Sequence, residues 1–558
     1  MRVSASNGPR GTNFEKAMSY PYVAESFEED ERSVLRRYFT NLDKPVFALV
    51  NLPEVVKGAL FARYSRSSKS LRRLFLDEFV DDLDISGDLT IDATMGLKRA
   101  ESLYEKVFVE YGDDSVAQLG GVHLACEQAS NILTKILEWG RIMSYLEQST
   151  RYIAYDARLP NGHYRYYRDP SILDSPHGAR YVGDMDRIFD SYGEMLPKMV
   201  AAISKLYPKK ETDSEIAWRS AVRAKALDSI RGLLPAASLS NVGIYGSGQS
   251  FENLLLRMRS HPLEEARLYS EMMLEELRKV IPSFLARVDR KERGGLWSQY
   301  MAQTRESLLD LTQEILPKER VAAPSSVQLS EFDPSGEISV AAAALYPYSD
   351  RPMASIRSHV ESLDSVALRD IFKALVGDRS NRRHRPGRAF EATSYTFDII
   401  SDYGAFRDLQ RHRLLTLDWQ VLDVNLGWDV PALVAEANLA DEFNSTMERS
   451  FELCEALKAD FEHQSQYAIA LGFKVRYKMT MNAREAMHII ELRSSPQGHP
   501  SYRRIAQEMH RQIAEVAGHH LIAESMNFVD YSDPELERLD SEERILKKRT
   551  QSASGPTS

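Results

Sequence analysis

The sequence has little cysteine and no long hydrophobic run. Its 2 cysteines, Cys126 and Cys454, are too few for a disulfide framework or a cysteine-ligated zinc site. No apolar stretch approaches the length of a membrane-spanning helix, and residues 1–20 lack the apolar core of a secretory signal. We therefore expect a cytoplasmic protein that is not bound to a membrane.

Positive charge is not in excess either. Lys and Arg total 71 against 81 Asp and Glu, which gives a net charge of −10. We therefore expect no nucleic-acid partner, although a local basic pocket for a smaller anion is compatible with this balance. With 43% hydrophobic and 27% charged residues, the 558-residue chain has the composition of a soluble globular protein of about four small domains or two large ones.

The distribution of polar residues divides the chain into two domains. Residues 1–35 are predicted to form a flexible tail and residues 541–558 a disordered one, because both are polar. Residues 316–335 combine Pro, Ser, Gly and charge without a sustained period, which is typical of a linker. The expected domains are therefore 36–315 and 336–540.

The same motifs occur in the same order in both domains. The first contains YGDDSVAQLGGVHLACEQASNILTKILEWGRIMSYLEQSTRYI and then SFENLLLRMRSHPLEEARLYSEMM. The second contains FEATSYTFDIISDYGAFRDLQRHRLLTLDWQVL and then TMNAREAMHIIELRSSPQGHPSYRRIAQEM. We interpret the domains as diverged tandem copies of one unit, the first copy and the second copy.

The hydrophobic period indicates an α+β fold. A strand is predicted over residues 390–400 and a helix over 403–411. Apolar spacings of three and four predict amphipathic helices over 483–492 and 501–519. We expect each copy to be a mostly antiparallel sheet covered by helices.

The densest group of cations is Arg411-His412-Arg413. Two guanidiniums on either side of an imidazole suit a pyrophosphate or nucleotide phosphate, because guanidinium pairs with phosphate oxygens at two points. The alternative is a solvated basic stretch near the end of a helix, where the dipole favours cations.

A second polar group is the segment SYLEQSTRY, which begins at Ser144. An extended backbone would place Glu147, Ser149 and Arg151 on one face, where they would hydrogen-bond a uracil edge and a phosphate. The alternative is a capped turn with a polar strand.

Two histidine-containing helices are also candidates. Asn482 is a suitable N-cap for a helix that carries His488 and Arg493, although a cap with an exposed arginine explains that pattern equally well. His519-His520 with Glu524 resembles a helical metal pair but lacks another ligand, so we favour a structural role and expect no metal. There is no P-loop, no GxSxG elbow and no dinucleotide loop.

Together these segments resemble the flavin-dependent thymidylate synthases, in two tandem copies covering most of 45–285 and 336–525. The hallmark of that family is Arg-His-Arg, then seven residues, then Ser-x-Arg. The resemblance implies an α/β unit that assembles into a homotetramer, with each active site built from several subunits. It also implies binding of FAD, dUMP and methylenetetrahydrofolate, with NADPH as the reductant.

The first copy keeps only the nucleotide half of this pattern. Trp139-Gly140 replaces the first Arg-His of the hallmark, and Asp113 and Gln118 replace further family residues. The residues that match the family's nucleotide side are Glu147, Ser149, Arg151, Arg231 and Arg257.

The second copy keeps the flavin half. Val421 and Asp423 stand at the Ser and Arg positions of the hallmark, and Gln466 stands where the first copy has Arg231. Asp423 would repel a phosphate. The residues that match the family's flavin side are Arg411, His412, Arg413, Glu391, Asn482, Arg484 and Arg493, with His488 where the family often has Asn.

These losses are complementary, so the second copy paired with the first would rebuild a complete site. The reverse pairing would place Trp139-Gly140 against Val421 and Asp423 and should be inactive. Two chains would then form a homodimer, a pseudo-tetramer of copies with two working sites. The alternative history is that both copies decayed and the complementarity is chance.

The resemblance implies an FAD-dependent methyltransferase that makes dTMP from dUMP, with methylenetetrahydrofolate and NADPH as co-substrates. Arg151 and Arg231 would be the catalytic residues. The implied substrate-binding residues are Glu147, Ser149, Arg151, Arg231, Arg257 and Arg411. The implied FAD-binding residues are Arg411, His412, Arg413, Glu391, Asn482, Arg484, His488 and Arg493. The alternative is a catalytically silent or altered homologue that binds flavin and a pyrimidine nucleotide.

Overall fold

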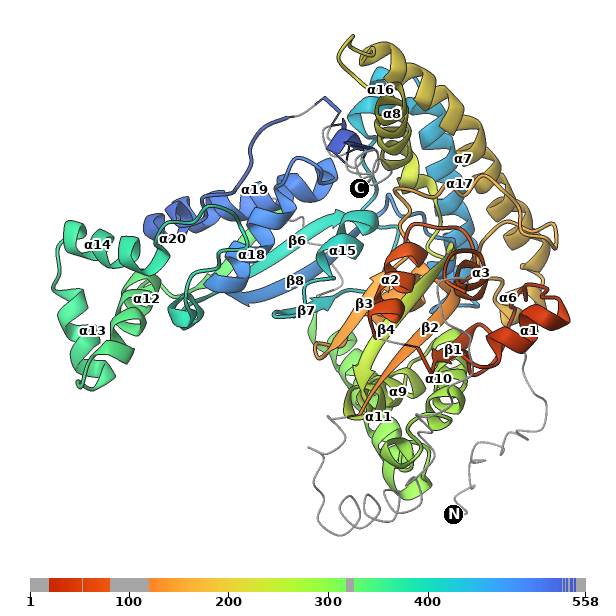
Figure 1. The fold of residues 1–558 in the computed structure, drawn as a ribbon, viewed down its shortest axis with the longest axis horizontal. Helices are drawn as coiled ribbons and strands as arrows, with labels where there is room; N and C mark the ends of the chain where they lie inside the picture. Colours follow the sequence, from red (N-terminus) through yellow and green to blue (C-terminus); the bar gives the residue numbers. More distant parts are fainter. Residues whose placement is uncertain are drawn as a thin grey trace, which may run out of the picture.

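The computed structural model describes residues 20–80, 120–317 and 326–547, without the single positions 53, 534, 537, 540, 541 and 545. Within these residues the chain forms two four-stranded antiparallel sheets with helices packed on them (Figure 1). The predicted α+β class is therefore confirmed.

The two sheets have the same topology. The first has the order β1-β2-β4-β3 and the second the order β5-β6-β8-β7. The strands are β1 (Val46–Leu49), β2 (Gly121–Ser130), β3 (Met143–Glu147), β4 (Leu239–Ser247), β5 (Val327–Phe332), β6 (Ser394–Asp402), β7 (Thr416–Trp419) and β8 (Lys474–Asn482). The equivalent strand order in the two sheets agrees with the repeat in the sequence, because two copies of one unit are expected to have the same topology.

Each inner strand of the two sheets is followed directly by a helix, and the last residue of the strand is the N-cap of that helix. The side chains of Ser130 and Ser247 accept backbone N–H groups at the starts of α5 (Asn131–Leu137) and α9 (Gly248–Arg259). Asp402 and Asn482 do the same for α15 (Tyr403–Leu409) and α18 (Ala483–Arg493), which confirms the predicted cap at Asn482. This junction positions the candidate site residues that follow the strands.

The remaining helices differ between the copies. In the first copy they are α1 (Glu29–Leu35), α2 (Glu54–Tyr64), α3 (Leu71–Glu78), α6 (Pro170–Leu173), α7 (Gly178–Leu206), α8 (Glu215–Ile230), α10 (Glu264–Arg278) and α11 (Leu296–Ile315). In the second they are α12 (Gly336–Leu345), α13 (Met353–Glu361), α14 (Ser365–Val376), α16 (Ala432–Glu436), α17 (Ala440–Lys458), α19 (Pro500–Glu515) and α20 (His520–Glu524). Helix α7 of the first copy lies beside α17 of the second copy (Figure 1).

Several predicted boundaries are wrong. The predicted linker 316–335 contains β5, which is hydrogen-bonded to β6, so the second copy begins before residue 336. The predicted tail 1–35 contains α1, whose Leu35 is fully buried. The predicted strand over 390–400 is displaced, because residues 388–392 form a 3-10 turn and β6 begins at Ser394.

The predicted helices also end differently. The helix predicted over 403–411 ends at Leu409. The helix predicted over 501–519 is α19, which ends at Glu515 and is separated from α20 by Gly518 at φ 71°. A positive φ of this kind stops a helix and favours glycine.

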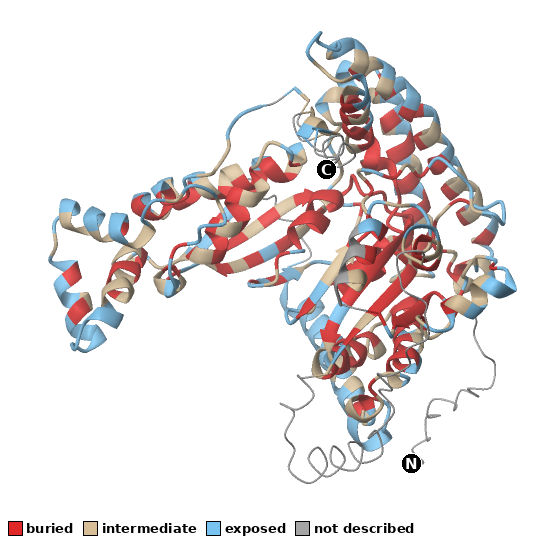
Figure 2. Ribbon diagram, viewed as in Figure 1, coloured by how far each residue is buried: buried red, intermediate tan, exposed pale blue. Residues whose placement is uncertain are grey.

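One hydrophobic core extends through both copies. Figure 2 shows buried residues, in red, in both of them. Backbone hydrogen bonds cross between them, from Ala236 N–H to the Ile469 carbonyl at 2.7 Å and from Gly472 N–H to the Gly232 carbonyl at 2.8 Å. A Cβ added at Gly232 would lie 3.3 Å from the Cα of Gly472, so glycine permits this close approach. Within the described residues, no helix is both long and apolar enough to cross a bilayer.

Candidate active site

The first and second copies meet at the carboxylate of Glu147, the last residue of β3. Arg411 Nη2 lies 2.9 Å from this carboxylate, and Arg407 Nη2 on α15 lies 2.7 Å from its other oxygen. Lys135 of α5 contributes a third cation at 3.2 Å. Burial alone would raise the pKa of Glu147, but these three cations hold it far below its usual value. Glu147 is therefore an ionised link between the copies.

The Arg151 guanidinium lies at the same junction. Its Nε donates to Asp228 at 2.8 Å, and its Nη1 donates to the Tyr502 hydroxyl of the second copy at 3.2 Å. Burial would lower the pKa of Arg151, but Asp228 and Tyr502 raise it above its usual value. A nearly buried arginine that bridges both copies is well placed to bind an anion between them.

The segment before Arg151 is a turn, so the predicted extended face of Glu147, Ser149 and Arg151 is wrong. Strand β3 ends at Glu147. The Ser149 hydroxyl then accepts the Arg151 backbone N–H at 3.3 Å, while the Ser149 N–H donates to the Ser65 carbonyl at 3.1 Å. Local hydroxyl-to-backbone bonds of this kind favour a turn over a strand.

Arg231 and Asp408 form the second pair of charges across the junction. Arg231 Nη1 lies 3.1 Å from Asp408, and the arginine is only 4% exposed. Its Nε and Nη2 are buried without a hydrogen-bond partner among the described residues. Burial would raise the pKa of Asp408, but Arg231, Arg411, Arg493 and Arg151 hold it well below its usual value.

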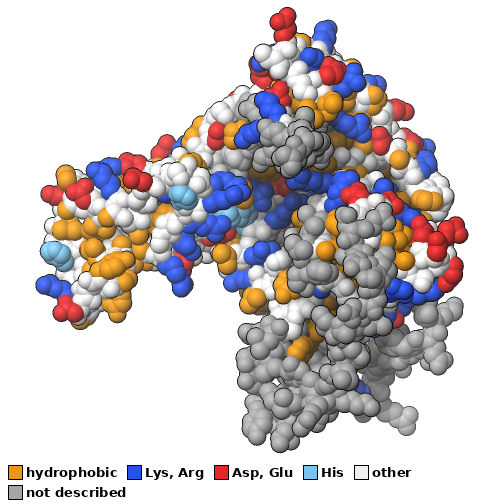
Figure 3. Space-filling view, viewed as in Figure 1, with side chains coloured by type: hydrophobic (Ala, Val, Ile, Leu, Met, Phe, Trp, Pro, Cys, Tyr) orange, Lys and Arg blue, Asp and Glu red, His pale blue; other side chains and the backbone are white. Residues whose placement is uncertain are grey.

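Positive charge exceeds negative charge in this cluster. Arg407 and Lys135 offset Glu147 and Glu138. Burial raises the pKa of Asp402 beside Arg231 and so favours its neutral form. That leaves the carboxylates Asp228 and Asp408 among the guanidiniums Arg151, Arg231, Arg411 and Arg493. Buried charges in proteins are normally paired, so this surplus favours an anionic ligand. Figure 3 shows Lys and Arg gathered in the hollow where the second copy meets the first.

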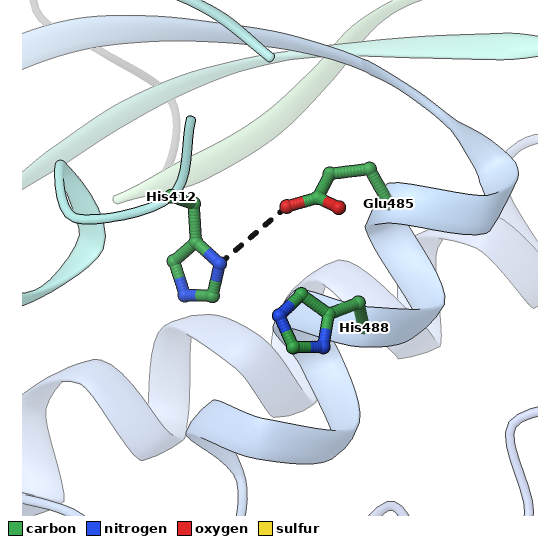
Figure 4. A group of neighbouring side chains, drawn as sticks. All are labelled: His412, Glu485 and His488. Atoms are coloured by element: carbon green, nitrogen blue, oxygen red, sulfur yellow. Dashed lines mark ion pairs between the residues drawn. The ribbon is translucent and has the colours of Figure 1, made fainter. Parts of the chain in front are cut away.

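His412 and His488 form a further cluster with Glu485 at the start of α18 (Figure 4). His412 Nδ1 lies 3.5 Å from Glu485, and its Nε2 accepts a hydrogen bond of 2.8 Å from Arg493. Burial and neighbouring guanidiniums lower the pKa of His412 well below its usual value and that of His488 to about 4. Burial also raises the pKa of Glu485 to about 7.

This cluster has the atoms of a metal site but the wrong surroundings for one. The three ligand atoms lie within 4.8 Å of one another. However, Arg493 already occupies one nitrogen of His412, and Arg385 Nη2 lies 3.2 Å from His488 Nδ1. Nearby guanidiniums repel a cation, so the donor set suits hydrogen bonding to an uncharged or anionic ligand instead.

The other flavin-side residues lie at the beginning of α18. Glu391 pairs with Arg388 at 2.9 Å and with Arg484 at 3.3 Å. Arg484 also donates to the Pro386 carbonyl at 3.0 Å, and the Asn482 side chain caps the helix. Their polar groups thus already have partners within the second copy.

A cavity of about 330 Å³ lies between the copies beside His412. The Arg257 guanidinium stacks on Trp139 at 4.8 Å, and Arg413 lies 5.9 Å from the Tyr145 ring. Neither arginine has a carboxylate partner among the described residues. The wall of the cavity also contains Glu138 and Asp418. The Trp139 ring and the two unpaired guanidiniums fit a planar, anionic ligand such as a flavin nucleotide.

The position of Arg257 differs from the predicted grouping. It lines the cavity with His412 and Arg413 and has no contact with Arg151 or Arg231 among the described residues. The reason is that α9, which carries it, faces the same cavity as the loop after α15. The structure therefore groups Arg257 with the predicted flavin side.

The reverse pairing places the altered hallmark of the first copy against β7. The Trp139 ring nitrogen donates to the Leu417 carbonyl at 3.3 Å, and Arg141 donates to Thr416 at 2.9 Å. The predicted neighbour Asp423 instead pairs with Lys458 at 2.9 Å. Asp113 and Gln118 lie outside the described residues.

Sequence reasoning missed both aspartates of the charge cluster. Asp228 and Asp408 stand three residues before Arg231 and Arg411, one helical turn earlier. This D-x-x-R spacing, repeated at two candidate arginines, was the available signal. His519, by contrast, has the structural role expected of it, because its Nδ1 lies 2.7 Å from the buried Tyr395 hydroxyl.

Comparison with known proteins identifies relatives along the whole chain. The family model described as thymidylate synthase complementing protein matches residues 59–283 and 328–518. A UPF0159 protein of Chlamydia muridarum is 39% identical over 523 residues, which cover 93% of this chain and 98% of that relative. A UPF0159 protein of Thermoplasma acidophilum is 32% identical over 515 residues, 88% of this chain and 98% of the relative.

One similar solved structure is a UMP/dUMP methylase PolB from Streptomyces cacaoi bound with 5-Br dUMP. It is 17% identical, covers 37% of this chain and 96% of its own, and has a TM-score of 0.28, too low to support an argument. The family model, by contrast, matches both copies and most of the chain. This chain therefore belongs to the thymidylate synthase complementing protein family, the flavin-dependent thymidylate synthases, as a tandem duplicate.

Proposed function

We propose that this chain is an FAD-dependent methyltransferase of the thymidylate synthase type. It would convert dUMP to dTMP, with methylenetetrahydrofolate as the one-carbon donor and NADPH as the reductant. The observation that carries the proposal is the contact of Arg411 in the second copy with Glu147 in the first, 2.9 Å within one chain. This contact supports the proposal, because Arg411 matches the flavin side of the family hallmark and Glu147 matches the nucleotide side.

The nucleotide would bind among Arg151, Arg231 and Arg411. Arg231 Nε and Nη2 have no hydrogen-bond partner among the described residues and would donate to a phosphate. Arg411, with 38% of its side chain exposed, is the member that solvent and ligand reach. Guanidiniums fixed near a uracil ring would stabilise negative charge that develops on it. Ser149 would be a binding group, since no covalent nucleophile is required.

The flavin would bind in the cavity lined by His412, Arg413, Arg257 and Trp139. FAD, when bound, supplies the redox chemistry, and the protein supplies position and field. The guanidiniums of Arg257 and Arg413 would hold the anionic part, and Trp139 would pack on a ring. The lowered pKa values of His412 and His488 keep both imidazoles neutral at pH 7, so they hydrogen-bond without adding charge.

The assembly we propose is a homodimer, in which two chains bring four copies together. Each chain would contribute one complete site, because the complementary halves already meet within it. The reverse pairing of Trp139 and Arg141 with β7 borders the proposed flavin cavity, so we expect it to bind flavin and not a second dUMP.

A second candidate is a silent or altered homologue that binds flavin and a pyrimidine nucleotide without making dTMP. Asp228 and Asp408 favour it, because they already bind Arg151 and Arg231 at 2.8 Å and 3.1 Å. A phosphate would have to share these arginines with two buried carboxylates.

Two measurements distinguish the active enzyme from the silent or altered homologue: binding of FAD, and release of the hydrogen at C5 of the uracil ring. We expect the purified protein to bind FAD and to release tritium from C5-labelled dUMP when methylenetetrahydrofolate and NADPH are present. Arg411→Ala and Arg151→Ala should abolish release, whereas Arg219→Ala, an exposed arginine on α8, should retain it. Flavin binding without release would favour an altered reaction, and absence of both would overturn the proposal.

A further inference from the structure

Helix α11 (Leu296–Ile315) is exposed beyond its first two turns, in which Met301 packs against the core and the Ser298 hydroxyl donates to the Leu256 carbonyl. None of its 20 residues is buried, and Figure 2 colours most of it as exposed. It follows a π-helical turn over Lys291–Gly295 and lies beyond the family match that ends at residue 283. An isolated helix of this length is marginal in water, because helices in proteins gain most of their stability from packing.

The exposed surface of α11 carries a regular apolar seam. Alternating steps of four and three residues connect the seam residues Trp297, Met301, Thr304, Leu308, Leu311 and Ile315. Leu308 is 59% exposed and Ile315 is 64% exposed. Such spacing is the pattern by which two helices pack side by side with interlocking side chains. A seam of this kind on an exposed helix marks an interaction surface.

We propose that α11 is a self-association surface that packs antiparallel against α11 of a second copy of this chain. In this arrangement Trp297 meets the partner's Ile315, and Met301 meets the partner's Leu311. Thr304 meets the partner's Leu308, so every seam residue has a seam residue opposite it. A parallel pairing would instead place Trp297 of one copy opposite Trp297 of the other. Two large rings would then crowd the same level of the interface.

Charge along the helix also favours an antiparallel partner of the same sequence. The turn that precedes α11 carries Lys291 and Arg293 against one acid, Glu292, whereas the second half of α11 carries Asp310 and Glu314, all of them exposed. Antiparallel packing places the acidic end of each copy beside the basic end of the other. Complementary charges of this kind set orientation between paired helices.

A cavity at the start of α11 would receive the far end of the partner helix. It has a volume of about 460 Å³ and lies between α9 and α11, with Leu256, Leu296, Trp297 and Tyr300 in its wall. Antiparallel packing brings the partner's Leu316 to this cavity, and Leu316 is 59% exposed in the single chain. The cavity lies at the start of α11, and Leu316 follows the end of the same helix. A twofold axis between two antiparallel copies of α11 therefore places the Leu316 side chain of each chain in the cavity of the other.

Self-association through α11 does not depend on the proposed activity. The candidate active site is complete within one chain, and α11 contributes no residue to it. Loss of self-association should therefore leave ligand binding intact, so this proposal and the proposed activity fail separately, whereas a monomeric full chain would also overturn the proposed homodimer.

The oligomeric state measured by analytical ultracentrifugation tests the seam. We expect a dimer for the full chain, and Leu308→Asp should raise its dissociation constant at least about 100-fold, because a charge would be buried in the seam twice, once from each copy. The matched control is Leu309→Asp, which alters the neighbouring exposed leucine outside the seam and should remain dimeric. Circular dichroism would show whether either variant still folds.

Cysteine cross-linking tests the direction of packing without a disruptive variant. A mixture of Thr304→Cys and Leu308→Cys chains should form a mixed disulfide dimer, whereas either chain alone should not. The native Cys126 and Cys454 are buried and should not compete. A monomeric full chain, an unchanged dimer in Leu308→Asp, or self-cross-linking of each single variant would overturn the proposal.

Discussion

The Arg411 guanidinium of the second copy lies 2.9 Å from the Glu147 carboxylate of the first copy, within the same polypeptide. Each copy has lost a different half of one sequence hallmark, and this ion pair joins the halves that remain. The same junction contains the bond of Arg151 to Tyr502, at 3.2 Å, and that of Arg231 to Asp408, at 3.1 Å. The proposed site therefore needs one chain rather than several subunits.

A single-chain site predicts that defective chains do not rescue one another. An Arg411→Ala chain and an Arg151→Ala chain each lack part of the same site, so a mixture that is refolded together should have no more tritium-release activity than either alone. Restored activity in the mixture would mean that the site forms between chains.

Replacing Glu147 by glutamine should destabilise the protein strongly. The substitution keeps the size of the side chain but leaves Arg407 and Lys135 buried without their carboxylate. Breaking a buried ion pair typically costs about 3–5 kcal/mol, and we expect a loss of that order in urea unfolding. The control, Glu29→Gln, alters an exposed ion pair and should change stability by less than about 1 kcal/mol. Equal stability of both variants would argue against Glu147 as the link between the copies.

Asp408→Asn should strengthen nucleotide binding while weakening the fold. Asp408 contributes negative charge to the arginine cluster, so its removal should lower the dissociation constant for dUMP by roughly tenfold. The melting temperature should fall, because Arg231 loses its charged partner. Titration calorimetry and thermal unfolding measure the two effects. Weaker dUMP binding in a folded variant would indicate that Asp408 positions Arg231 for the ligand.

The stability contributed by Glu485 should decrease as pH rises. Burial raises its pKa from 4.5 to about 7, so between these values the folded protein keeps a proton that the unfolded chain releases. Wild-type stability relative to Glu485→Gln should therefore fall by up to about 3 kcal/mol between pH 5 and pH 8. Urea unfolding at both pH values measures this difference, and a constant difference would show that Glu485 titrates normally.

The sequence predicted the repeat, the α+β class and the helix cap at Asn482, because these depend on spacing over a few residues. It also placed Arg411 with the nucleotide half, because the losses in the two hallmarks are complementary. The turn at Ser149 was one of two alternatives, because a short polar segment is compatible with both a turn and a strand. β5 was hidden because Pro, Ser and Gly flank its alternating Val327 and Leu329.

The D-x-x-R spacing marks the positions of the two aspartates, but local spacing does not predict which arginines they contact. Asp408 contacts Arg231 and Asp228 contacts Arg151 across 177 and 77 residues of sequence. Arg257 lies on the flavin side and not on the predicted nucleotide side for a similar reason, since the packing of α9 determines which cavity the Arg257 side chain lines. Long-range packing of this kind has no signature in a single sequence.

The stoichiometry of ligand binding tests the central claim most directly. Titration calorimetry of dUMP into the FAD-loaded protein counts the sites in each chain. Our account predicts one dUMP per chain, bound at the junction of the two copies and lost in Arg411→Ala. Two dUMP molecules per chain, or one whose binding survives Arg411→Ala, would contradict it.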